Sequence, residues 1–213
     1  MLHAARLMAG NSTILLKNSA VWVPSHSPYQ THQKQGVLDN KKWRVTELNR
    51  KYECSPSYPS YLVIPASISD DALRNVFNYR SKGRIPALCW IHPSTGAPML
   101  RCSQPAVGLT GKRCQEDEQL FEAIRVSVNN PDKVYVVDAR PLLNAVANQL
   151  KGLGYEKQYP NMNISFVGIE NIHKMRESCK KLRKICLSDD SLSTKLTKIE
   201  STKWLSKCRF FKM

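Results

Sequence analysis

The sequence lacks long apolar runs and closely spaced cysteine pairs, and both absences narrow what the protein can be. Its longest apolar stretches, residues 61–65 and 134–137, fall far short of the roughly 18–20 residues that a membrane-spanning helix needs. The seven cysteines are an odd number and form no Cys-x-x-Cys pair, which argues against a zinc ribbon or a disulfide framework. We therefore expect no transmembrane helix, and reduced cysteines that serve as small buried apolar residues in a cytoplasmic protein.

Acidic residues are absent from the first 38 positions, which carry Arg6, Lys17 and Lys34. Two interpretations of this segment are open. A mitochondrial transit peptide is typically poor in acidic residues. Scarce arginine and the apolar triplet Val21-Trp22-Val23, which is typical of a short strand, instead favour an irregular leader of the main domain.

Acidic residues are also outnumbered along the whole chain. The sequence has 17 Asp and Glu against 32 Lys and Arg, which gives a formal net charge of +15 over 213 residues. This excess favours an anionic partner, such as a phosphorylated lipid, an acidic membrane surface or nucleic acid. Because the sequence has no Arg-aromatic repeat and no zinc-finger spacing, we do not expect nucleic acid to be a partner.

Short apolar runs alternate with amphipathic helical patterns from Lys41 onward, which predicts an α/β domain with a mixed central sheet flanked by helices. The predicted strands are residues 61–65, 87–91, 98–102, 134–137 and 164–169. Pro93-Ser-Thr-Gly96 predicts a hairpin between the second and third strands, with its tip in water. The predicted helices are residues 70–79, 116–128 and 172–185, with two more that begin at Pro141 and Ile199, and the polar residues 188–197 are predicted to form a loop.

Two junctions at which a strand ends and a helix begins are the candidate sites, because ligands of open α/β sheets collect outside the carboxyl ends of strands. The first junction runs through Asp138 and Arg140 into a helix that carries Asn144 and Asn148 on one face. Arg140 is placed either to bind an anion through its guanidinium or to pair with Asp138 and hold the turn. The two asparagines suit a ligand or neighbouring backbone groups equally well.

The second junction follows the strand predicted at 164–169. Asn171 stands where a helix N-cap would stand, and His173 and Arg176 are three apart on one helical face. The positive end of the helix dipole faces this loop, which suits an anion. The alternative is that Asn171 only caps the helix and that His173 is a hydrogen-bonded histidine at the edge of the core.

Seven short motifs follow one another along the chain. They are Arg84-Ile-Pro86, Trp90-Ile-His92, Arg101-Cys-Ser-Gln-Pro105, Asp138-Ala-Arg-Pro141, Asn144-Ala-Val-Ala-Asn148, Gly154-Tyr-Glu156 and Ile169-Glu-Asn-Ile-His173-Lys-Met-Arg-Glu-Ser178. In order and spacing they resemble the myotubularin family of phosphoinositide phosphatases, over about residues 33–205. The resemblance implies an incomplete cysteine-dependent phosphatase domain with a protein tyrosine phosphatase-like fold, between a divergent leader at 1–32 and a divergent tail at 206–213.

The activity that the resemblance implies is removal of the 3-phosphate from phosphatidylinositol 3-phosphate and phosphatidylinositol 3,5-bisphosphate. The resemblance also places such a protein in the cytoplasm, peripherally on endosomal membranes. By the same resemblance, Asn148 and the pair Asn171-Ile172 match positions that line the pocket for the inositol headgroup. We expect no metal and no cofactor, and the resemblance suggests homodimers or heterodimers with other myotubularin-related proteins.

The catalytic loop of such phosphatases is missing from these 213 residues. The family attacks phosphorus with a thiolate in a Cys-x5-Arg loop, whose N–H groups and arginine hold the phosphoryl oxygens. Six positions after the first six cysteines stand Ser60, Thr95, Gly108, Leu120, Ile185 and Leu192, and Cys208 is followed by only five residues. We therefore assign no catalytic residue and expect no hydrolysis by this polypeptide. The alternative function is a catalytically dead regulatory or adaptor protein that binds phosphoinositides or an active relative.

Overall fold

The structure of the protein, a computed structural model, describes residues 28–128 and 132–208. Its first half contains α2 (Pro28–Lys34), β1 (Trp43–Thr46), β2 (Leu62–Pro65), α3 (Asp70–Tyr79), the 3-10 turn η1 (Ser81–Gly83), β3 (Ala87–Ile91), β4 (Pro98–Arg101) and α4 (Gln115–Val126). Its second half contains β5 (Val134–Asp138), α5 (Leu142–Ala147), the 3-10 turn η2 (Asn148–Lys151), β6 (Met162–Phe166), α6 (Ile172–Cys186), α7 (Leu192–Ser201) and α8 (Trp204–Cys208). The strand suggested at 21–23 lies outside the described residues.

The α/β class is confirmed, but the prediction of one mixed central sheet is wrong. Within residues 28–128 and 132–208 the strands form three separate pairs: β1–β2 and β3–β4 are antiparallel, and β5–β6 is parallel. A register shift in β3 between Leu88 and Trp90 bends and twists that strand. Helix α4 contacts both β2 and β5, so helix packing rather than a shared hydrogen-bonded ladder joins the first pair to the third.

The predicted hairpin is confirmed in β3 and β4. His92 N–H donates to the Ala97 carbonyl over 2.9 Å, and Gly96 N–H donates to the His92 carbonyl over 2.9 Å. The tip residues 92–97 are exposed, as expected for a turn rich in Pro, Ser and Gly. All five predicted strands are present, although the strand predicted at 164–169 spans Met162–Phe166, and β1 is a sixth that the sequence pattern did not reveal.

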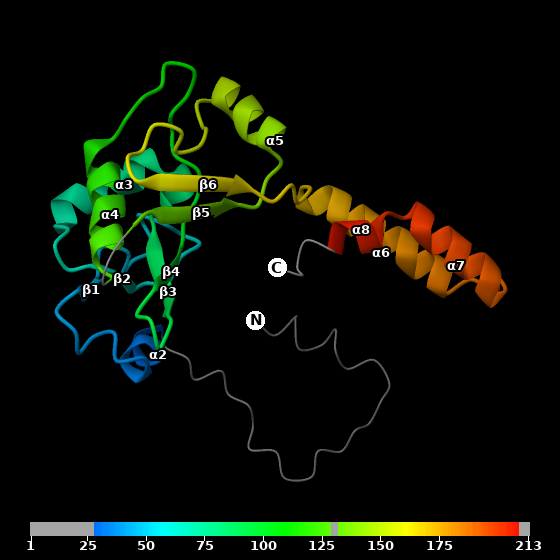
Figure 1. The fold of residues 1–213 in the computed structure, drawn as a ribbon, viewed down its shortest axis with the longest axis horizontal. Helices are drawn as coiled ribbons and strands as arrows, with labels where there is room; N and C mark the ends of the chain where they lie inside the picture. Colours follow the sequence, from blue (N-terminus) through cyan, green and yellow to red (C-terminus); the bar gives the residue numbers. More distant parts are fainter. Residues whose placement is uncertain (1–27, 129–131, 209–213) are drawn as a thin grey trace, which may run out of the picture.

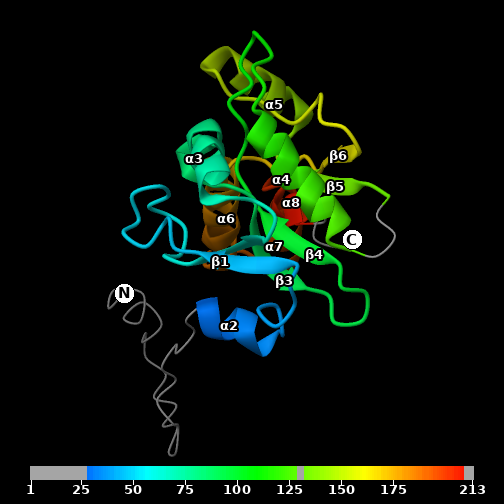
Figure 2. The same ribbon diagram turned by 90° about the vertical axis from the view of Figure 1, so that its left-hand side faces the viewer.

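The arrangement in space separates a packed body from a helical arm (Figure 1). In the body, α3 lies above β1 and β2 and α2 lies below them (Figures 1 and 2). Helices α6, α7 and α8, which we call the helical arm, contact one another and project from the body. None of the described helices is long and apolar enough to cross a membrane.

The prediction of a loop at 188–197 is wrong, because α7 spans Leu192–Ser201. Ser191 caps this helix, and its side chain accepts a hydrogen bond from the Thr194 backbone N–H. Leu192, Leu196 and Ile199 recur at helical spacing, but the Ser, Thr and Lys residues between them hide the pattern. The helix expected from Ile199 is therefore the end of α7, and a separate short helix, α8, begins at Trp204.

The hydrophobic core lies between the β1–β2 pair and helices α3 and α4. Helix α3 begins at the Ser69 cap, and its Leu73, Val76 and Phe77 side chains are buried on one face. Helix α4 contributes Leu120 and Ile124 to the same core. Burial of these apolar side chains is the main stabilising contribution to the body, at about 1.5–3 kcal/mol for each fully buried large side chain.

A buried arginine joins four segments of the body. The Arg80 side chain is completely buried, and its Nε donates to Asp117 Oδ1 of α4 over 2.8 Å. Its Nη1 donates to the Ser103 carbonyl over 2.7 Å and also to the Glu156 carboxylate. The guanidinium lies 5.1 Å from the centre of the Phe121 ring. A charge removed from water in this way persists only because its hydrogen-bond donors are satisfied.

We expect the replacement Gly83→Ala to destabilise the body by about 3 kcal/mol. Gly83 has φ of +63°, and a Cβ at this position would lie 1.9 Å from the Cys54 carbonyl oxygen. The matched control is Gly96→Ala at the hairpin tip, where φ is +69° but nothing lies within 4 Å of the added Cβ. Urea unfolding should give a loss of only about 1 kcal/mol for that control. Equal losses at both positions would contradict the close approach to Cys54.

Candidate functional site

The structure brings the two strand-to-helix junctions together. Strands β5 and β6 are parallel and in register from Val134 opposite Met162, so their carboxyl ends meet at one edge. The loops that follow them are hydrogen-bonded to each other. Val167 N–H donates to the Asp138 carbonyl over 2.8 Å, and Ile169 N–H donates to the Ala139 carbonyl over 2.7 Å. Residues that are distant in the sequence therefore surround one place on the surface.

A cleft of about 490 Å³ lies at this place, and we call it the junction cleft. Its lining residues come from both junctions and are Ala139, Arg140, Asn144, Ala147, Asn148, Lys151, Ile169, Glu170 and Asn171. Two of the three predicted headgroup residues, Asn148 and Asn171, therefore line the same cleft. The third, Ile172, is 74% exposed and lines a neighbouring groove between α6 and α8. Ile169 and Glu170 line both hollows.

All three nitrogens of the Arg140 guanidinium make hydrogen bonds within the protein. Its Nη2 lies 2.6 Å from Asp138 Oδ2 and 3.0 Å from the Gly154 carbonyl, and its Nη1 donates to Gln104 Oε1. Of the two hypotheses for Arg140, anion binding or pairing with Asp138, the structure therefore shows the pair with Asp138. Arg140 forms a wall of the junction cleft, and its charge is offset by the Asp138 carboxylate.

Asn148 and Asn171 each use one side-chain polar atom in hydrogen bonds within the protein. Asn171 caps α6, and its Oδ1 accepts from the backbone N–H groups of His173 and Lys174, both over 3.1 Å. Asn148 donates from Nδ2 to Gln104 Oε1 over 3.1 Å. Within the described ranges, Oδ1 of Asn148 and Nδ2 of Asn171 make no hydrogen bond. The Asn148 Oδ1 acceptor and the Asn171 NH2 group are thus left for a ligand.

The sequence did not indicate Lys151, which lines the cleft, or Gln104, which bonds to the lining residues Arg140 and Asn148. Lys151 is exposed, lines the junction cleft and forms no ion pair with any residue that the structure describes. Its position three residues after Asn148 on a helical turn could have indicated it. Of the three candidates at the second junction, only Asn171 lines the cleft: His173 does not line it, and Arg176 lines the groove between α6 and α8.

Three of the described cysteines, Cys89, Cys102 and Cys114, offer no activated thiolate. Cys102 lies 3.8 Å from Arg80 Nη1, but burial raises the pKa of its thiol to about 11. Burial also raises the pKa of Cys114 to about 11 and that of Cys89 above its usual value. A phosphatase nucleophile requires the opposite shift, toward a thiolate at neutral pH. Proximity of Cys102 to an arginine therefore does not substitute for the missing loop.

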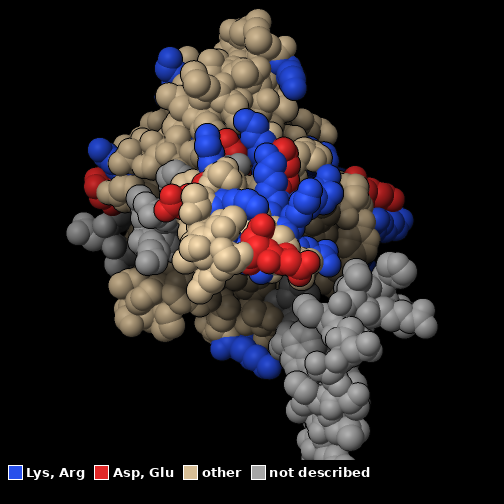
Figure 3. Space-filling view, turned by 90° about the vertical axis from the view of Figure 1, so that its right-hand side faces the viewer, with Lys and Arg blue, Asp and Glu red and all other residues tan. Residues whose placement is uncertain are grey.

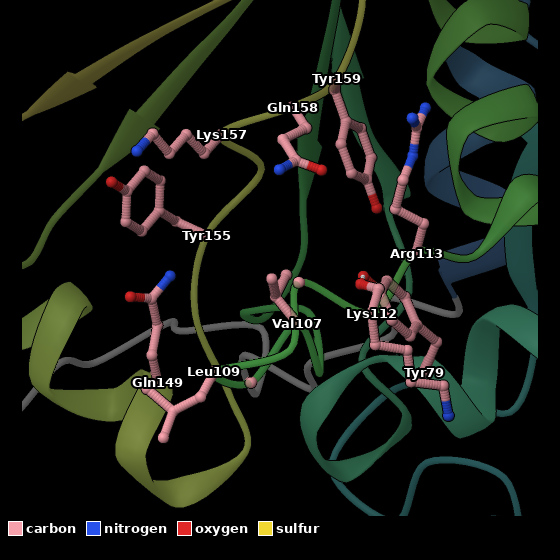
Figure 4. A pocket seen from close by; sticks show the side chains of 12 residues that line it. Tyr79, Val107, Leu109, Lys112, Arg113, Gln149, Tyr155, Lys157, Gln158 and Tyr159 are labelled. Atoms are coloured by element: carbon pink, nitrogen blue, oxygen red, sulfur yellow. Dashed lines mark hydrogen bonds between the residues drawn. The ribbon is translucent and has the colours of Figure 1, made fainter.

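A third, smaller pocket of about 160 Å³ lies beside η2 (Figure 4). Tyr155 and Lys157 lie on one side of it, and Tyr159 lies on the other. The Tyr79 hydroxyl donates to the Lys112 carbonyl over 2.7 Å, and the Tyr159 hydroxyl donates to the buried Asp117. Burial and the Asp117 carboxylate raise the pKa of Tyr159 far above its ordinary value. These two hydroxyls hold the fold and are not available as acids or bases.

The described residues contain no group of three or more His, Cys, Asp or Glu side chains that could hold a metal ion. The junction cleft is lined by three asparagine amides, the Lys151 ammonium group, the Glu170 carboxylate and small or apolar side chains, with the paired Arg140 in its wall. Hydroxyl and phosphate groups are the chemistry that such a lining can recognise.

Comparison with known proteins decides the family. The family model of the myotubularin-like phosphatase domain matches residues 13–211. This chain belongs to the myotubularin-like phosphatase family. The resemblance that the sequence motifs indicated is therefore confirmed.

Curated relatives agree with the family assignment. Phosphatidylinositol-3,5-bisphosphate 3-phosphatase MTMR2 of Mus musculus is 46% identical over 183 residues, which cover 85% of this chain and 27% of that protein. The Bos taurus protein of the same name is 47% identical over 177 residues, covering 82% and 26%. Myotubularin of Rattus norvegicus is 43% identical over 182 residues, covering 84% and 30%. The myotubularin-like chain thus spans less than a third of the length of these relatives.

Proposed function

We propose that the junction cleft binds the inositol headgroup of a 3-phosphorylated phosphoinositide, and that the 213-residue chain does not hydrolyse it. The observation that carries this proposal is the meeting of Asn148 and Asn171 in one cleft of about 490 Å³. The name of the relative in Mus musculus, a phosphatidylinositol-3,5-bisphosphate 3-phosphatase, supports this class of ligand.

The free polar atoms of the cleft suit such a headgroup. An inositol ring offers hydroxyl groups that both donate and accept, so one hydroxyl can donate to Asn148 Oδ1 and another can accept from Asn171 Nδ2. The Lys151 ammonium, which forms no ion pair with any described residue, supplies a positive charge for a phosphate group. The net charge of +15 adds a long-range attraction for a polyanion.

We infer that residues 33–205 form an incomplete, protein tyrosine phosphatase-like domain without its nucleophile. The family match over 13–211 supports the domain type, and the absence of any Cys-x5-Arg sequence among the 213 residues supports the lack of turnover. The thiols of Cys89, Cys102 and Cys114 all have raised pKa values, which supports the same inference.

We also propose a cytoplasmic protein that associates peripherally with endosomal membranes. Lys180, Lys181, Arg183 and Lys184 are exposed on α6. In the view toward the helical arm, Lys and Arg side chains gather over its end, with Asp and Glu among them (Figure 3). Clustered basic side chains near a bilayer are attracted to anionic lipids, and this attraction would add to headgroup binding.

The second candidate function is an adaptor that pairs with an active myotubularin-related protein. A groove of about 740 Å³ lies between α6 and α8 and is lined by Ile172, Met175 and Trp204 among others. It favours a protein partner, because covering exposed apolar surface lowers the free energy. Binding to such a relative without binding to the headgroup would select this function over the first.

Headgroup binding is tested by calorimetric titration with inositol 1,3-bisphosphate. We expect Asn148→Ala to weaken binding about tenfold, because a hydrogen bond to the ligand contributes about 0.5–1.5 kcal/mol or more when charge is involved. Asn171→Ser keeps an oxygen that caps α6 but removes the amide donor, so it should weaken binding similarly while leaving helix content unchanged.

The matched control is Asn78→Ala, which alters an exposed asparagine of α3 away from the junction cleft. It should leave the affinity unchanged. If the wild-type chain shows no saturable binding, or if all three variants bind as it does, the proposal is wrong.

A further inference from the structure

The side chain of Gln104 connects two walls of the junction cleft although it does not itself line it. Its Oε1 accepts from Asn148 Nδ2 over 3.1 Å and also accepts from Arg140 Nη1. Two donors from the first junction therefore converge on one acceptor oxygen. That acceptor is supplied by the segment after β4, which is distant from the junction in the sequence.

The backbone that carries Gln104 is fixed in turn by the buried arginine. Ser81 N–H donates to the Gln104 carbonyl over 3.0 Å, and Arg80 Nη1 donates to the Ser103 carbonyl over 2.7 Å. Arg80 and Pro105 also form an isolated β-bridge. These contacts attach the backbone of Gln104 to the core of the body, so the Gln104 side chain starts from a fixed position.

The two partners of Gln104 depend on it to different extents. Arg140 keeps its pair with Asp138 and its bond to the Gly154 carbonyl when the Gln104 oxygen is removed. For Asn148 the bond to Gln104 is the side-chain hydrogen bond that the structure records. Without it the half-buried amide of Asn148 is free to rotate, and its Oδ1 loses a defined direction.

We propose that Gln104 is a positioning residue of the headgroup site: by holding Asn148 Nδ2, it turns Asn148 Oδ1 to accept from an inositol hydroxyl. The inference rests on the proposed function, since it concerns the same cleft. Gln104 acts through Asn148, because a planar amide with its nitrogen held must point its oxygen in another direction. Pre-orientation of this kind increases affinity by reducing what must be ordered on binding.

The test compares the full chain with the variant Gln104→Met, which keeps the length of the side chain and removes the acceptor. Titration with inositol 1,3-bisphosphate should show about tenfold weaker binding. In the Asn148→Ala background the same replacement should change the affinity less than twofold, because the group through which Gln104 acts is already gone. In the ligand-free protein, the side-chain amide NMR signals of Asn148 should shift in Gln104→Met.

The control is Gln119→Met on the exposed face of α4, which should alter neither the affinity nor the Asn148 signals. A tenfold loss that persists in the Asn148→Ala background would indicate a general structural role and overturn the inference, as would unchanged binding by Gln104→Met. A shifted Asn148 signal in a protein that never binds the headgroup would overturn the proposed function and, with it, the role of Gln104 in binding. Binding by the wild type with no effect of Gln104→Met would overturn the positioning role alone.

Discussion

Replacement of Arg80 by leucine is expected to lower the free energy of unfolding by about 3–5 kcal/mol. The Arg80 side chain is completely buried against Asp117, which is also completely buried, and against Glu156, which is 6% exposed. Its removal leaves two carboxylates in the interior without a compensating charge. In a chain of this size such a loss corresponds to a fall of roughly 10 °C in the melting temperature.

A surface pair of the same chemistry provides the control. Arg113 makes a two-pronged contact with Glu118, at 2.6 Å and 2.5 Å, but its side chain is 55% exposed. We expect Arg113→Leu to leave the midpoint of thermal unfolding almost unchanged, because solvent screens an exposed ion pair. If the two leucine variants melted together, the Arg80 cluster would not be the internal support that we describe.

Arg80→Lys separates charge from geometry at the same position. A lysine keeps the positive charge but cannot form the two parallel bonds from Nε and Nη2 to Asp117 and, at the same time, the bonds from Nη1 to Ser103 and Glu156. We expect its melting temperature to lie between those of the wild type and Arg80→Leu. A value equal to the wild type would show that charge alone matters here.

The second large effect concerns turnover: the 213-residue chain should release no phosphate from short-chain phosphatidylinositol 3-phosphate. Loss of a nucleophile together with its oxyanion-binding groups removes on the order of a millionfold of rate in enzymes that use both. No cysteine of this sequence is followed by an arginine six positions later. The half-buried Cys102 near Arg80 is a thiol whose pKa is raised to about 11, so it does not supply the missing thiolate.

The measurement is a colorimetric phosphate assay with purified chain. A variant with all seven cysteines replaced by serine serves as the control and should give the same background signal. Phosphate release by the wild type above that control would refute the lack of turnover, and a covalent phosphocysteine adduct would do the same. Equal phosphate signals from the wild type and the control would agree with a chain that does not hydrolyse the lipid.

Local structure was largely predictable from the sequence. The apolar runs at 87–91 and 134–137 and the capped pattern at 70–79 all became the expected elements, because periodicity and caps act over a few residues. Helix α7 was missed because polar residues separate Leu192, Leu196 and Ile199. Strand β1 was missed because Arg44 and Thr46 alternate with Trp43 and Val45, so no apolar run marks it.

The pairing of strands was less predictable, because it depends on contacts between distant segments. Short apolar runs do not show which partner each will meet, and the three separate pairs replaced the single sheet that we expected. The same holds for Arg80. Nothing around this residue in the sequence shows that Asp117 and Glu156 will converge on it in the core.

The candidate site was predictable as a set of residues and not as a mechanism. Resemblance and junction chemistry both indicated Asn148 and Asn171, and the structure places both in one cleft. The commitment of Arg140 to Asp138 remained open until the geometry was known. The shared acceptor in Gln104 comes from a third segment, so no reading of the two junctions alone could have found it.

Phosphorus NMR of short-chain phosphatidylinositol 3-phosphate mixed with the full chain reports binding and hydrolysis in the same spectrum. We predict that the 3-phosphate signal shifts and broadens as chain is added, that Asn148→Ala reduces the change, and that no inorganic phosphate signal grows with time. A growing inorganic phosphate signal, or lipid signals that the protein leaves untouched, would contradict a headgroup site without a catalytic loop.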